Sequence, residues 1–561
     1  MTVTDTTLLA DLRHIVGKRH VLTGSSATLR FRRGYRGAAG QALAVVRPGT
    51  LVEQWRVLAA CVAADVIVIT QAANTGLTGG STPQGDYDRP VVIVSTMRLT
   101  GLYLLDGAQR ALCLPGVTLH QLERALRPLG REPHSVIGSS CFGASVIGGV
   151  CNNSGGSLVR RGPAYTEAAL YARLGDDGTI ALIDTIGLGE GDALSVLARL
   201  DAGQVPGDAG AQAIARSDPD YARHVRDVAA ATPARYNADP RRLRGASGSA
   251  GRVMVFAVAV DTFAKESATT TFYIGSNDPA VLTRLRRAML DSDLPLPIAA
   301  EYLHRTTFAT AARYGRDTAF AIRRLGTDRL PGLFAAKARI DSAFGRLGVR
   351  DASERMMQAA APLLPGAVPA RIGAWHERYE HHLLLKVSED DAEATRALLD
   401  RLAGDGDAGS FTCTPTEAEA AFLLRFVAAG AAVRRQAVDR AVGGIVALDV
   451  ALPRNATEWL PAVPAAVRDD VLAEMHYGHF FCHVFHRDYL IRRGGDAMRV
   501  KRALLAALDA EGAEYPAEHN VGHSYVAKPA LANFYRSLDP RNRLNPGIGA
   551  TSRAPRWGEQ A

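Results

Sequence analysis

Two segments rich in glycine and other small residues constrain the fold of this 561-residue chain more than any other feature. The first, residues 71–81 (QAANTGLTGGS), follows directly on the apolar run Val66–Thr70. The second, residues 138–156, holds six glycines in nineteen residues, with valine and isoleucine between them. Glycine lets a backbone approach a ligand closely, and successive amides can then form an anion-binding concavity. A glycine-rich turn is the alternative for the first segment alone. The second segment predicts a chain wrapped around a flat, buried ligand.

These segments differ from the common dinucleotide-binding pattern. A Rossmann site needs GxGxxG between a strand and a helix, with an acidic residue about 20 positions further on. Neither segment has that spacing. The sequence therefore argues against NAD as the cofactor.

The length of the chain predicts two or three domains. Up to about residue 260, short β-branched strands such as Val91–Ser95 alternate with helical patterns such as Thr118–Leu129, and a strand at Val253–Val260 closes this part. Beyond it, the strand-like runs Thr269–Ile274 and His382–Val387 flank long helical stretches. The pattern predicts an α/β part followed by a second region of mixed structure.

Several cellular settings are disfavoured by composition. The six cysteines are widely spaced, without a CxxC pair, which indicates a reducing compartment. The first residues lack the basic start and apolar run of a signal peptide. No stretch of 18 apolar residues occurs, so no transmembrane helix is expected.

Basic residues are concentrated between residues 304 and 350. This segment contains ten Lys and Arg against three Asp and no Glu, and so carries +7 of the net charge of +8. Phenylalanine and leucine lie among the cations, a mixture that suits the anionic face of a bilayer. Each cation near such a surface contributes about 1 kcal/mol. Nucleic acid is the competing acidic partner, but no nucleic-acid-binding motif is present. A solvated helical face is the third interpretation.

Histidines gather towards the C-terminus. His476, His479, His483 and His486 have offsets that would place them on one face of a helix. His519 follows Glu518 in the segment EHNVGH, and imidazole is well suited to accept a proton near neutral pH. A hydrogen-bonded structural histidine is the alternative for His519.

A family resemblance becomes specific at these motifs. In order, AANTGLTGGS, LPGVTLHQLERAL, VIGSSCFGASVIGG and NNSGG resemble the FAD-binding domain of the vanillyl-alcohol oxidase / p-cresol methylhydroxylase (PCMH) superfamily. REPHSVIGSS, RGPAYTE, TPARYNADP, YEHHLLLK and YPAEHNVGH extend the resemblance over nearly the whole chain, to the bacterial quinone-dependent D-lactate dehydrogenases. It implies an α+β fold: a two-subdomain PCMH-type FAD-binding domain (1–262 and 510–561), an α/β cap domain (263–303 and 380–509) and a mainly helical, basic membrane-binding region (304–379).

The resemblance also implies the residues that contact FAD. They are Ala72, Ala73, Asn74, Thr75, Gly76, Gly80, Ser81, Gly138, Ser145, Gly155 and Val255. No His or Cys stands in the first glycine-rich segment to attach the flavin covalently, so the expectation is non-covalent FAD.

For the substrate site, the resemblance supplies a base, a metal site and two cations. His519 is the expected base, in a segment that resembles GEHGxG but has Asn520 where glycine is usual. Metal-binding relatives use two histidines seven apart and the Glu of this segment, which His479, His486 and Glu518 match. Such ligands suit zinc or manganese, although the aromatic residues between the histidines equally fit a packed wall beside the flavin. Arg371 and Lys386 are expected to hold the substrate carboxylate.

The resulting expectation is a peripheral enzyme on the cytoplasmic side of the bacterial inner membrane. It would oxidise D-lactate to pyruvate, pass the electrons to ubiquinone and contact anionic phospholipid, without binding nucleic acid. The alternatives are an FAD dehydrogenase of another D-2-hydroxy acid, such as glycolate or 2-hydroxyglutarate, and a membrane adaptor without turnover.

Overall fold

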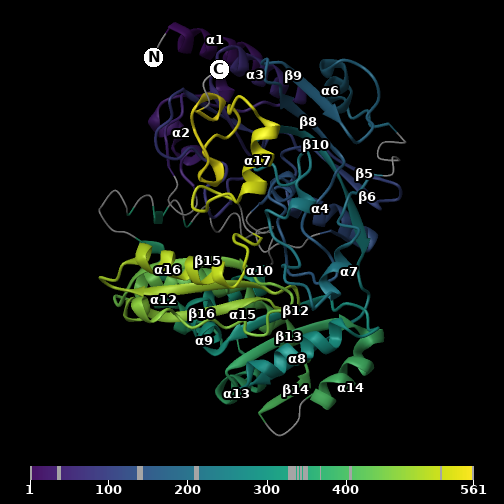
Figure 1. Ribbon diagram of the computed structural model, residues 1–561, viewed down its shortest axis with the longest axis vertical. Helices are drawn as coiled ribbons and strands as arrows, with labels where there is room; N and C mark the ends of the chain where they lie inside the picture. Colours follow the sequence, from purple (N-terminus) through teal and green to yellow (C-terminus); the bar gives the residue numbers. More distant parts are fainter. Residues whose placement is uncertain are drawn as a thin grey trace.

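The computed structural model describes most of the chain, with three β-sheets and the helices that cover them (Figure 1). The described residues are 3–34, 39–134, 143–206, 214–325, 337, 340–341, 344, 351–366, 368–402, 407–518 and 521–558. The N-terminal half lies in the upper part of Figure 1, where the yellow C-terminal segment returns to it, and the largest sheet lies below.

The first sheet has four strands in the order β1-β2-β4-β3, of which β2, β4 and β3 run parallel. The strands are β1 (Val21–Leu22), β2 (Ala44–Val46), β3 (Ile67–Gln71) and β4 (Val91–Ser95), and the helices of this part are α1 (Val3–Val16), α2 (Ser25–Arg32) and α3 (Leu51–Ala63). Thr50 begins α3 by accepting a hydrogen bond from the Glu53 amide, as a good N-cap residue does. The predicted strands at 66–70 and 91–95 are confirmed to within one residue.

The second sheet is built around the long strand β10 and shares one hydrophobic core with the first. Its order is β5-β6-β10-β8-β9, with β7 also paired to β10. Its strands are β5 (Leu102–Leu105), β6 (Arg110–Cys113), β7 (Arg131–Pro133), β8 (Ala169–Leu174), β9 (Ile180–Asp184) and β10 (Met254–Ala264), with helices α4 (Leu119–Leu126), α5 (Val146–Cys151), α6 (Ala193–Asp201) and α7 (Tyr221–Arg226) nearby in the chain. The amphipathic stretch predicted at 118–129 forms α4 behind a capping box of Thr118 and Gln121.

The C-terminal segment, which contains α17 (Pro529–Leu538), is tied into this N-terminal part. Leu544 forms a parallel bridge with Val68 of β3. The buried Arg252 donates hydrogen bonds to the Asn542 side chain at 2.5 Å and the Leu544 carbonyl at 3.1 Å. The residues just before this segment are therefore brought back against the first glycine-rich loop.

The third sheet has seven antiparallel strands in the order β14-β11-β13-β12-β16-β17-β15. They are β11 (Thr269–Ser276), β12 (Ala299–His304), β13 (His381–Ser388), β14 (Ala408–Thr412), β15 (Val442–Ala451), β16 (Val471–His479) and β17 (Val484–Arg492). Helices α8 (Pro279–Leu290), α14 (Ala392–Leu402) and α16 (Ala497–Ala510) pack on one face, while α9 (Arg305–Tyr314) and α15 (Pro415–Val438) pack on the other. In register, β12 pairs with β13 up to His304 and His381, so the chain between them leaves and re-enters the sheet at adjacent residues.

The prediction of a helix bearing four histidines is wrong. His476 and His479 lie on β16 and His486 lies on β17, with a turn at 480–483 in which His483 has φ of 52°. Val484, Phe485, Tyr489 and Ile491, which follow this turn, are residue types that favour a strand over a helix. Because the hairpin folds back on itself, a spacing of seven still brings His479 and His486 together.

The basic region contributes helices α10 (Arg316–Leu325) and α12 (Ala352–Ala360), followed by α13 (Ala370–Arg378). Most of residues 326–350 lie outside the described part, including four of the ten cations: Arg329, Arg339, Arg346 and Arg350. Among the described helices, none combines the length and the apolar character needed to cross a bilayer.

A buried arginine holds α10 and α12 against α15. Arg434 on α15 pairs with Asp317 of α10 at 3.2 Å and with Glu354 of α12, which also pairs with Lys337. The three side chains Arg434, Asp317 and Glu354 are 5%, 10% and 11% exposed. Arg434 is therefore the shared counter-ion of two carboxylates that α10 and α12 bring out of water, and Lys337 adds a second positive charge beside Glu354.

We expect Arg434→Met to loosen α10 and α12, because both carboxylates lose their shared counter-charge in a buried place. The loss of about 3 kcal/mol predicts roughly 100-fold faster amide hydrogen exchange in these two helices. Arg435→Met is the matched control, since the Arg435–Asp439 pair is more exposed at 21% and 27%. Equal exchange in the two variants would contradict the role of Arg434.

Candidate active site

The first glycine-rich segment forms a loop that its own side chains and its neighbours hold in shape. Gln71, at the end of β3, donates from Nε2 to the carbonyls of Phe31 at 2.9 Å and Ser81 at 2.7 Å, and so closes the loop. Asn74 has a φ of 55° and donates to the carbonyl of Arg33 at 2.9 Å. The loop from Ala72 to Ser81 therefore presents a preformed, half-buried backbone that contains seven of the predicted FAD contacts, five of them consecutive from Ala72 to Gly76.

The second segment meets the C-terminal segment at its glycines. Ser145 begins α5 by accepting a hydrogen bond from the Gly148 amide at 3.0 Å. A Cβ atom at Gly155 would collide with the Glu518 carboxylate, so only glycine permits this approach. Gly138 lies outside the described residues, and Val255 is buried on β10.

The first segment meets the same C-terminal stretch. A Cβ atom at Gly80 would lie 3.1 Å from the Val521 carbonyl oxygen, and one at Gly522 would collide with Thr78. His523 donates its amide to the Thr78 carbonyl at 3.2 Å. Both predicted halves of the cofactor cradle thus contact the C-terminal segment, the second half at Glu518 and the first half at residues 521–523. A close-packed backbone cradle of this kind fits a flat cofactor that carries phosphates.

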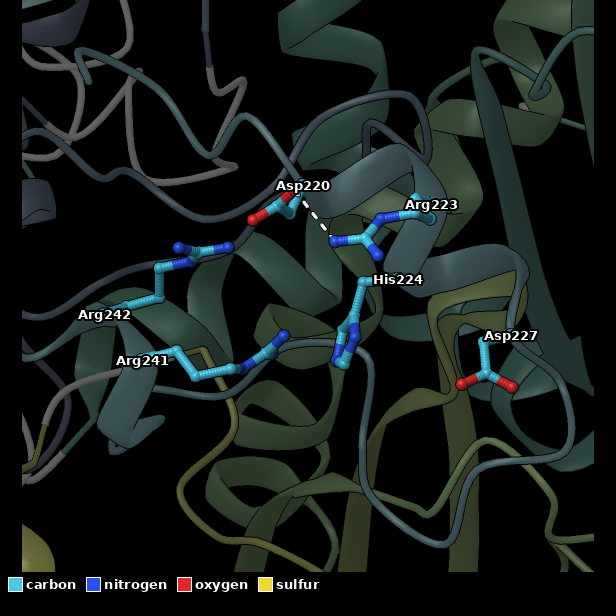
Figure 2. Close-up of a pocket in the computed structure, with 6 residues that line it drawn as sticks. All are labelled: Asp220, Arg223, His224, Asp227, Arg241 and Arg242. Atoms are coloured by element: carbon cyan, nitrogen blue, oxygen red, sulfur yellow. Dashed lines mark hydrogen bonds and ion pairs between the residues drawn. The ribbon is translucent and has the colours of Figure 1, made fainter. Parts of the chain in front are cut away.

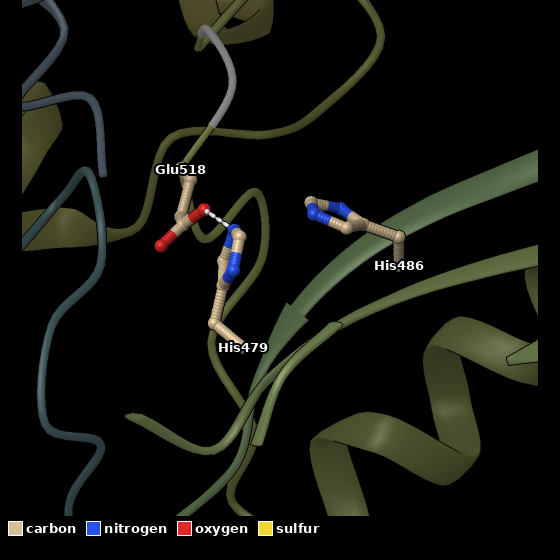
Figure 3. A group of neighbouring side chains, drawn as sticks. All are labelled: His479, His486 and Glu518. Atoms are coloured by element: carbon tan, nitrogen blue, oxygen red, sulfur yellow. Dashed lines mark ion pairs between the residues drawn. The ribbon is translucent and has the colours of Figure 1, made fainter. Parts of the chain in front are cut away.

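Three potential metal ligands converge where the large sheet faces this cradle (Figure 3). One ligand atom from each of His479, His486 and Glu518 lies within 4.8 Å of the other two. The Nε2 atom of His479 is 3.0 Å from Oε2 of Glu518. Glu518 and His479 are buried, and His486 is nearly so.

The sheet register orients both histidines. His479 is the cross-strand partner of Glu301 on β12, and His486 is the cross-strand partner of Asp449 on β15. Nδ1 of His479 lies 2.6 Å from Oε1 of Glu301, and Nδ1 of His486 lies 3.2 Å from Oδ1 of Asp449. Each carboxylate on Nδ1 leaves Nε2 directed elsewhere, as in metal sites whose histidines are held by carboxylates.

Asp449 also fixes the acidic member of the group. Its second oxygen accepts the backbone amide of Glu518 at 2.7 Å. Arg235, which comes from the N-terminal part of the chain, pairs with Oε1 of Glu518 at 2.6 Å. The carboxylate of Glu518 is therefore held from both sides, with one oxygen towards Arg235 and the other towards His479.

These contacts set the charges of the cluster. Burial alone would lower the pKa of His479, but Glu301 and Glu518 outweigh it and raise that pKa to about 9. Burial opposes ionisation of Glu518, but Arg235 and His479 lower its pKa well below the usual value. Without a ligand, a protonated His479 thus lies between two carboxylates, where a cation of another kind fits equally well.

The other two histidines of the hairpin do not join this cluster. His476 pairs with Glu474 at 3.1 Å, and Nδ1 of His483 lies 3.0 Å from the Pro453 carbonyl oxygen. Burial lowers the pKa of both, so these rings are neutral and packed among aromatic residues. His519 lies outside the described residues.

The two cations predicted for the substrate carboxylate are placed differently from each other. Lys386 on β13 is two residues from Leu384, the register partner of Glu301, so it shares a sheet face with Glu301. Arg371 pairs with Glu417 at 3.3 Å and lies over the Phe411 ring on edge strand β14. The structure does not bring Arg371 to the histidine cluster.

Four charged residues of the site were not predicted from sequence: Glu301, Asp449, Arg235 and Arg425. Arg425 on α15 lies with Nε 2.8 Å from Oε2 of Glu301. A signal was present, because Glu301 in AAEYL and Arg425 in FLLRF each interrupt an apolar run. Charged residues at inward positions are almost never buried unless they are paired.

A separate cavity of about 340 Å³ lies at α7 and the short helix Pro240–Arg242 (Figure 2). It is lined by Asp220, Arg223, His224, Asp227, Arg241 and Arg242. Its cations pair with neighbouring acids, as Arg241 does with Asp239 at 2.5 Å and Arg223 with Asp220 at 3.1 Å. None of the residues predicted to bind FAD, substrate or metal lines this cavity.

Comparison with known proteins places the chain among flavoenzymes. Residues 42–178 match the family model of an FAD binding domain, and residues 271–557 match that of "D-lactate dehydrogenase, membrane binding". A quinone-dependent D-lactate dehydrogenase of Escherichia coli is 49% identical, covering 100% of this chain and 99% of its own length. Those of Haemophilus influenzae and Corynebacterium glutamicum are 47% and 42% identical, covering 98% and 99% of this chain and 99% of their own lengths.

Solved structures confirm the predicted α+β fold with a PCMH-type FAD-binding domain. A p-cresol methylhydroxylase with substrate bound superposes with a TM-score of 0.62 at 13% identity, covering 98% of each chain. A 4-ethylphenol oxidase from Gulosibacter chungangensis gives a TM-score of 0.59 at 13% identity, covering 99% of this chain and 98% of its own. At such identity the likeness shows the fold alone.

Proposed function

This chain belongs to the family of quinone-dependent D-lactate dehydrogenases, and we propose that it oxidises D-lactate to pyruvate and passes the electrons to ubiquinone. The observation that carries the proposal is the contact between Gly155 of the cradle and Glu518 of the histidine–carboxylate cluster. It puts a group suited to a substrate hydroxyl directly beside the residues predicted to hold a flavin.

We propose that FAD is bound non-covalently by the cradle. When bound, FAD supplies the hydride acceptor and the route for electrons to the quinone. The predicted contacts remain Ala72, Ala73, Asn74, Thr75, Gly76, Gly80, Ser81, Gly138, Ser145, Gly155 and Val255. No His or Cys stands among residues 72–81 to form a covalent link.

The protein groups have distinct proposed roles. His519 takes the hydroxyl proton, next to a Glu518 that Arg235 and Asp449 hold in place. The burial of His479 and Glu518 keeps water from the reacting atoms. Lys386, on the same sheet face as Glu301, adds positive charge that attracts the substrate carboxylate.

Anaerobic mixing tests this function directly. D-lactate should bleach the flavin absorbance of the purified holoenzyme, whereas L-lactate, glycolate and 2-hydroxyglutarate should do so far more slowly. His519→Ala should slow bleaching by D-lactate by roughly 100-fold or more, as loss of a general base does. If the flavin is reduced by another hydroxy acid and not by D-lactate, the substrate assignment fails.

We also propose a divalent cation, zinc or manganese, on His479, His486 and Glu518. Two imidazoles and a carboxylate are common ligands of both ions, and the cation would polarise the substrate hydroxyl. Support comes from the convergence of the three ligand atoms within 4.8 Å and from the carboxylates that orient both imidazoles. A bound cation would replace the proton that His479 otherwise carries.

The metal proposal predicts about one zinc or manganese ion per chain after equilibration and desalting, measured by elemental analysis. His486→Ala should remove it, because a single ligand loss leaves only two protein donors. His476→Ala is the matched control, since His476 lies on the same hairpin but pairs with Glu474. Equal metal content in the two variants would exclude this site.

We propose that the membrane surface contacted is the anionic, cytoplasmic face of the bacterial inner membrane. Ten large apolar side chains are exposed in the described part of the chain, and four of them lie between residues 340 and 363: Ile340, Phe344, Met356 and Leu363, exposed by 40%, 38%, 57% and 87%. The nearby cations Arg323 and Arg324 are exposed at the end of α10. Each of the five described cysteines is free, which suits a reducing compartment.

Binding to vesicles tests this contact. Vesicles that contain phosphatidylglycerol should bind the protein more tightly than phosphatidylcholine vesicles, and added salt should reduce the difference. Arg323→Gln/Arg324→Gln should weaken binding roughly 10- to 30-fold at low salt, since each cation contributes about 1 kcal/mol. The same change at Arg223 and Arg284, two exposed arginines elsewhere, is the control. Salt-independent binding would contradict the electrostatic part of the proposal.

A further inference from the structure

Arg425 lies beside the histidine–carboxylate cluster with part of its guanidinium group unused. Its Nε atom lies 2.8 Å from Oε2 of Glu301, and its Cζ atom lies 4.8 Å from the centre of the Tyr477 ring. Neither Nη atom has a hydrogen-bond partner among the described residues, and the side chain is 11% exposed. The group is thus anchored at one edge and free at the other.

The contrast with Arg235 is informative. Arg235 pairs with Glu518 and also donates to the carbonyls of Gly156, Leu158 and Arg161, so both of its Nη atoms are occupied. Arg434 likewise uses its guanidinium on two acids. A guanidinium has five N–H donors. The Nη atoms of Arg425 are not among the buried side-chain atoms that lack a hydrogen-bond partner, so they reach solvent and are accessible to a ligand. The free edge of Arg425 can therefore receive an anionic ligand, whereas Arg235 has no free Nη atom.

The position of Arg425 relative to the cluster specifies that ligand. Glu301 contacts Arg425 through one oxygen and His479 through the other. Tyr477, which lies under Arg425, is the cross-strand partner of His486, and their ring centres are 5.3 Å apart. Arg425 is therefore separated from each histidine by a single side chain, Glu301 before His479 and Tyr477 before His486.

We propose that the two Nη atoms of Arg425 bind the carboxylate of a small 2-hydroxy acid, whose hydroxyl then faces His479 and Glu518. This site deepens the proposed function and rests on it. A planar guanidinium can hold both oxygens of a carboxylate and so fixes its orientation. Glu301 is the positioning residue, because it sets the relation between the cation and His479.

This site replaces Arg371 in the role expected for it. Arg371 donates to the Thr412 carbonyl at 2.7 Å, pairs with Glu417 and lies 3.6 Å from the centre of the Phe411 ring. The strand that Arg371 packs on, β14, lies four strand positions from β16, which carries His479. At about 4.8 Å per strand, the two strands are roughly 19 Å apart. Arg371 is thus occupied and distant, while Arg425 is adjacent and has donors to spare.

Measurements of ligand binding distinguish a role of Arg425 in holding the substrate carboxylate from a purely structural role. Arg425→Met should weaken binding of oxalate to the oxidised holoenzyme, followed by the flavin spectrum, by roughly 10- to 100-fold, as expected for a lost charge-assisted pair. The KM for D-lactate should rise by a similar factor. Lactamide has the same shape without the charge, so its weak inhibition should be equal in the variant and the parent protein. Arg435→Met, ten residues further along the same helix, is the control for both measurements.

A further variant keeps the proposal testable if Arg425→Met folds poorly, and a rescue measurement supports it if Arg425→Met folds. Arg425→Lys keeps the charge but not the fork, so oxalate affinity should fall between those of the parent and Arg425→Met, and added guanidinium should partly restore binding to Arg425→Met. Unchanged oxalate affinity in Arg425→Met, or in Arg425→Lys where only that variant folds, would overturn the proposal. So would an equal loss of lactamide binding. If the parent enzyme is reduced by a different hydroxy acid, the proposed function fails while the same comparison, made with that acid, still tests Arg425.

Discussion

The buried ion pair of Arg235 and Glu518 is the contact on which the arrangement of the site depends. Arg235 comes from the N-terminal part of the chain and is held by three backbone carbonyls, so its charge is fixed in space. Glu518 lies against Gly155 and is 0% exposed, so its charge requires that partner. Because Glu518 also contacts His479, this single pair joins the cradle, the large sheet and the C-terminal segment. Loss of either charge would leave the other buried and uncompensated, which is strongly unfavourable.

Strand pairing also brings residues that are far apart in sequence to this site. Two cross-strand pairs, Glu301 with His479 and Asp449 with His486, supply the sheet side of the site. Sheet register alone places them, because it sets which residues face each other and on which side. The site is therefore as rigid as the sheet, and only the C-terminal segment must close on it.

The sequence was informative where short-range periodicity decides structure. The alternating and apolar runs at 66–70 and 91–95 and the capped amphipathic stretch from Thr118 predicted their elements closely. The histidine hairpin was mistaken for a helix because offsets of three and seven satisfy a helix face, whereas the turn at 480–483 carries no glycine or proline to reveal it. The spacing of His479, His486 and Glu518 came from a family resemblance, and their convergence is a fact of the structure. Partners such as Glu301, 178 residues from His479, depend on strand pairing that one sequence does not specify.

The pairing of His304 with His381 makes the region between them an insertion between two neighbouring strands of the sheet. In an ordinary antiparallel sheet, two such residues are joined by a tight turn of a few residues. Here the whole excursion through α9, α10, α12 and α13 occupies the place of that turn. Both ends of the excursion meet at one register pair, and the residues that pair Glu301 with His479 lie outside it. The exposed apolar and basic surface of the excursion and the strands that carry Glu301 and His479 thus belong to separate stretches of the chain.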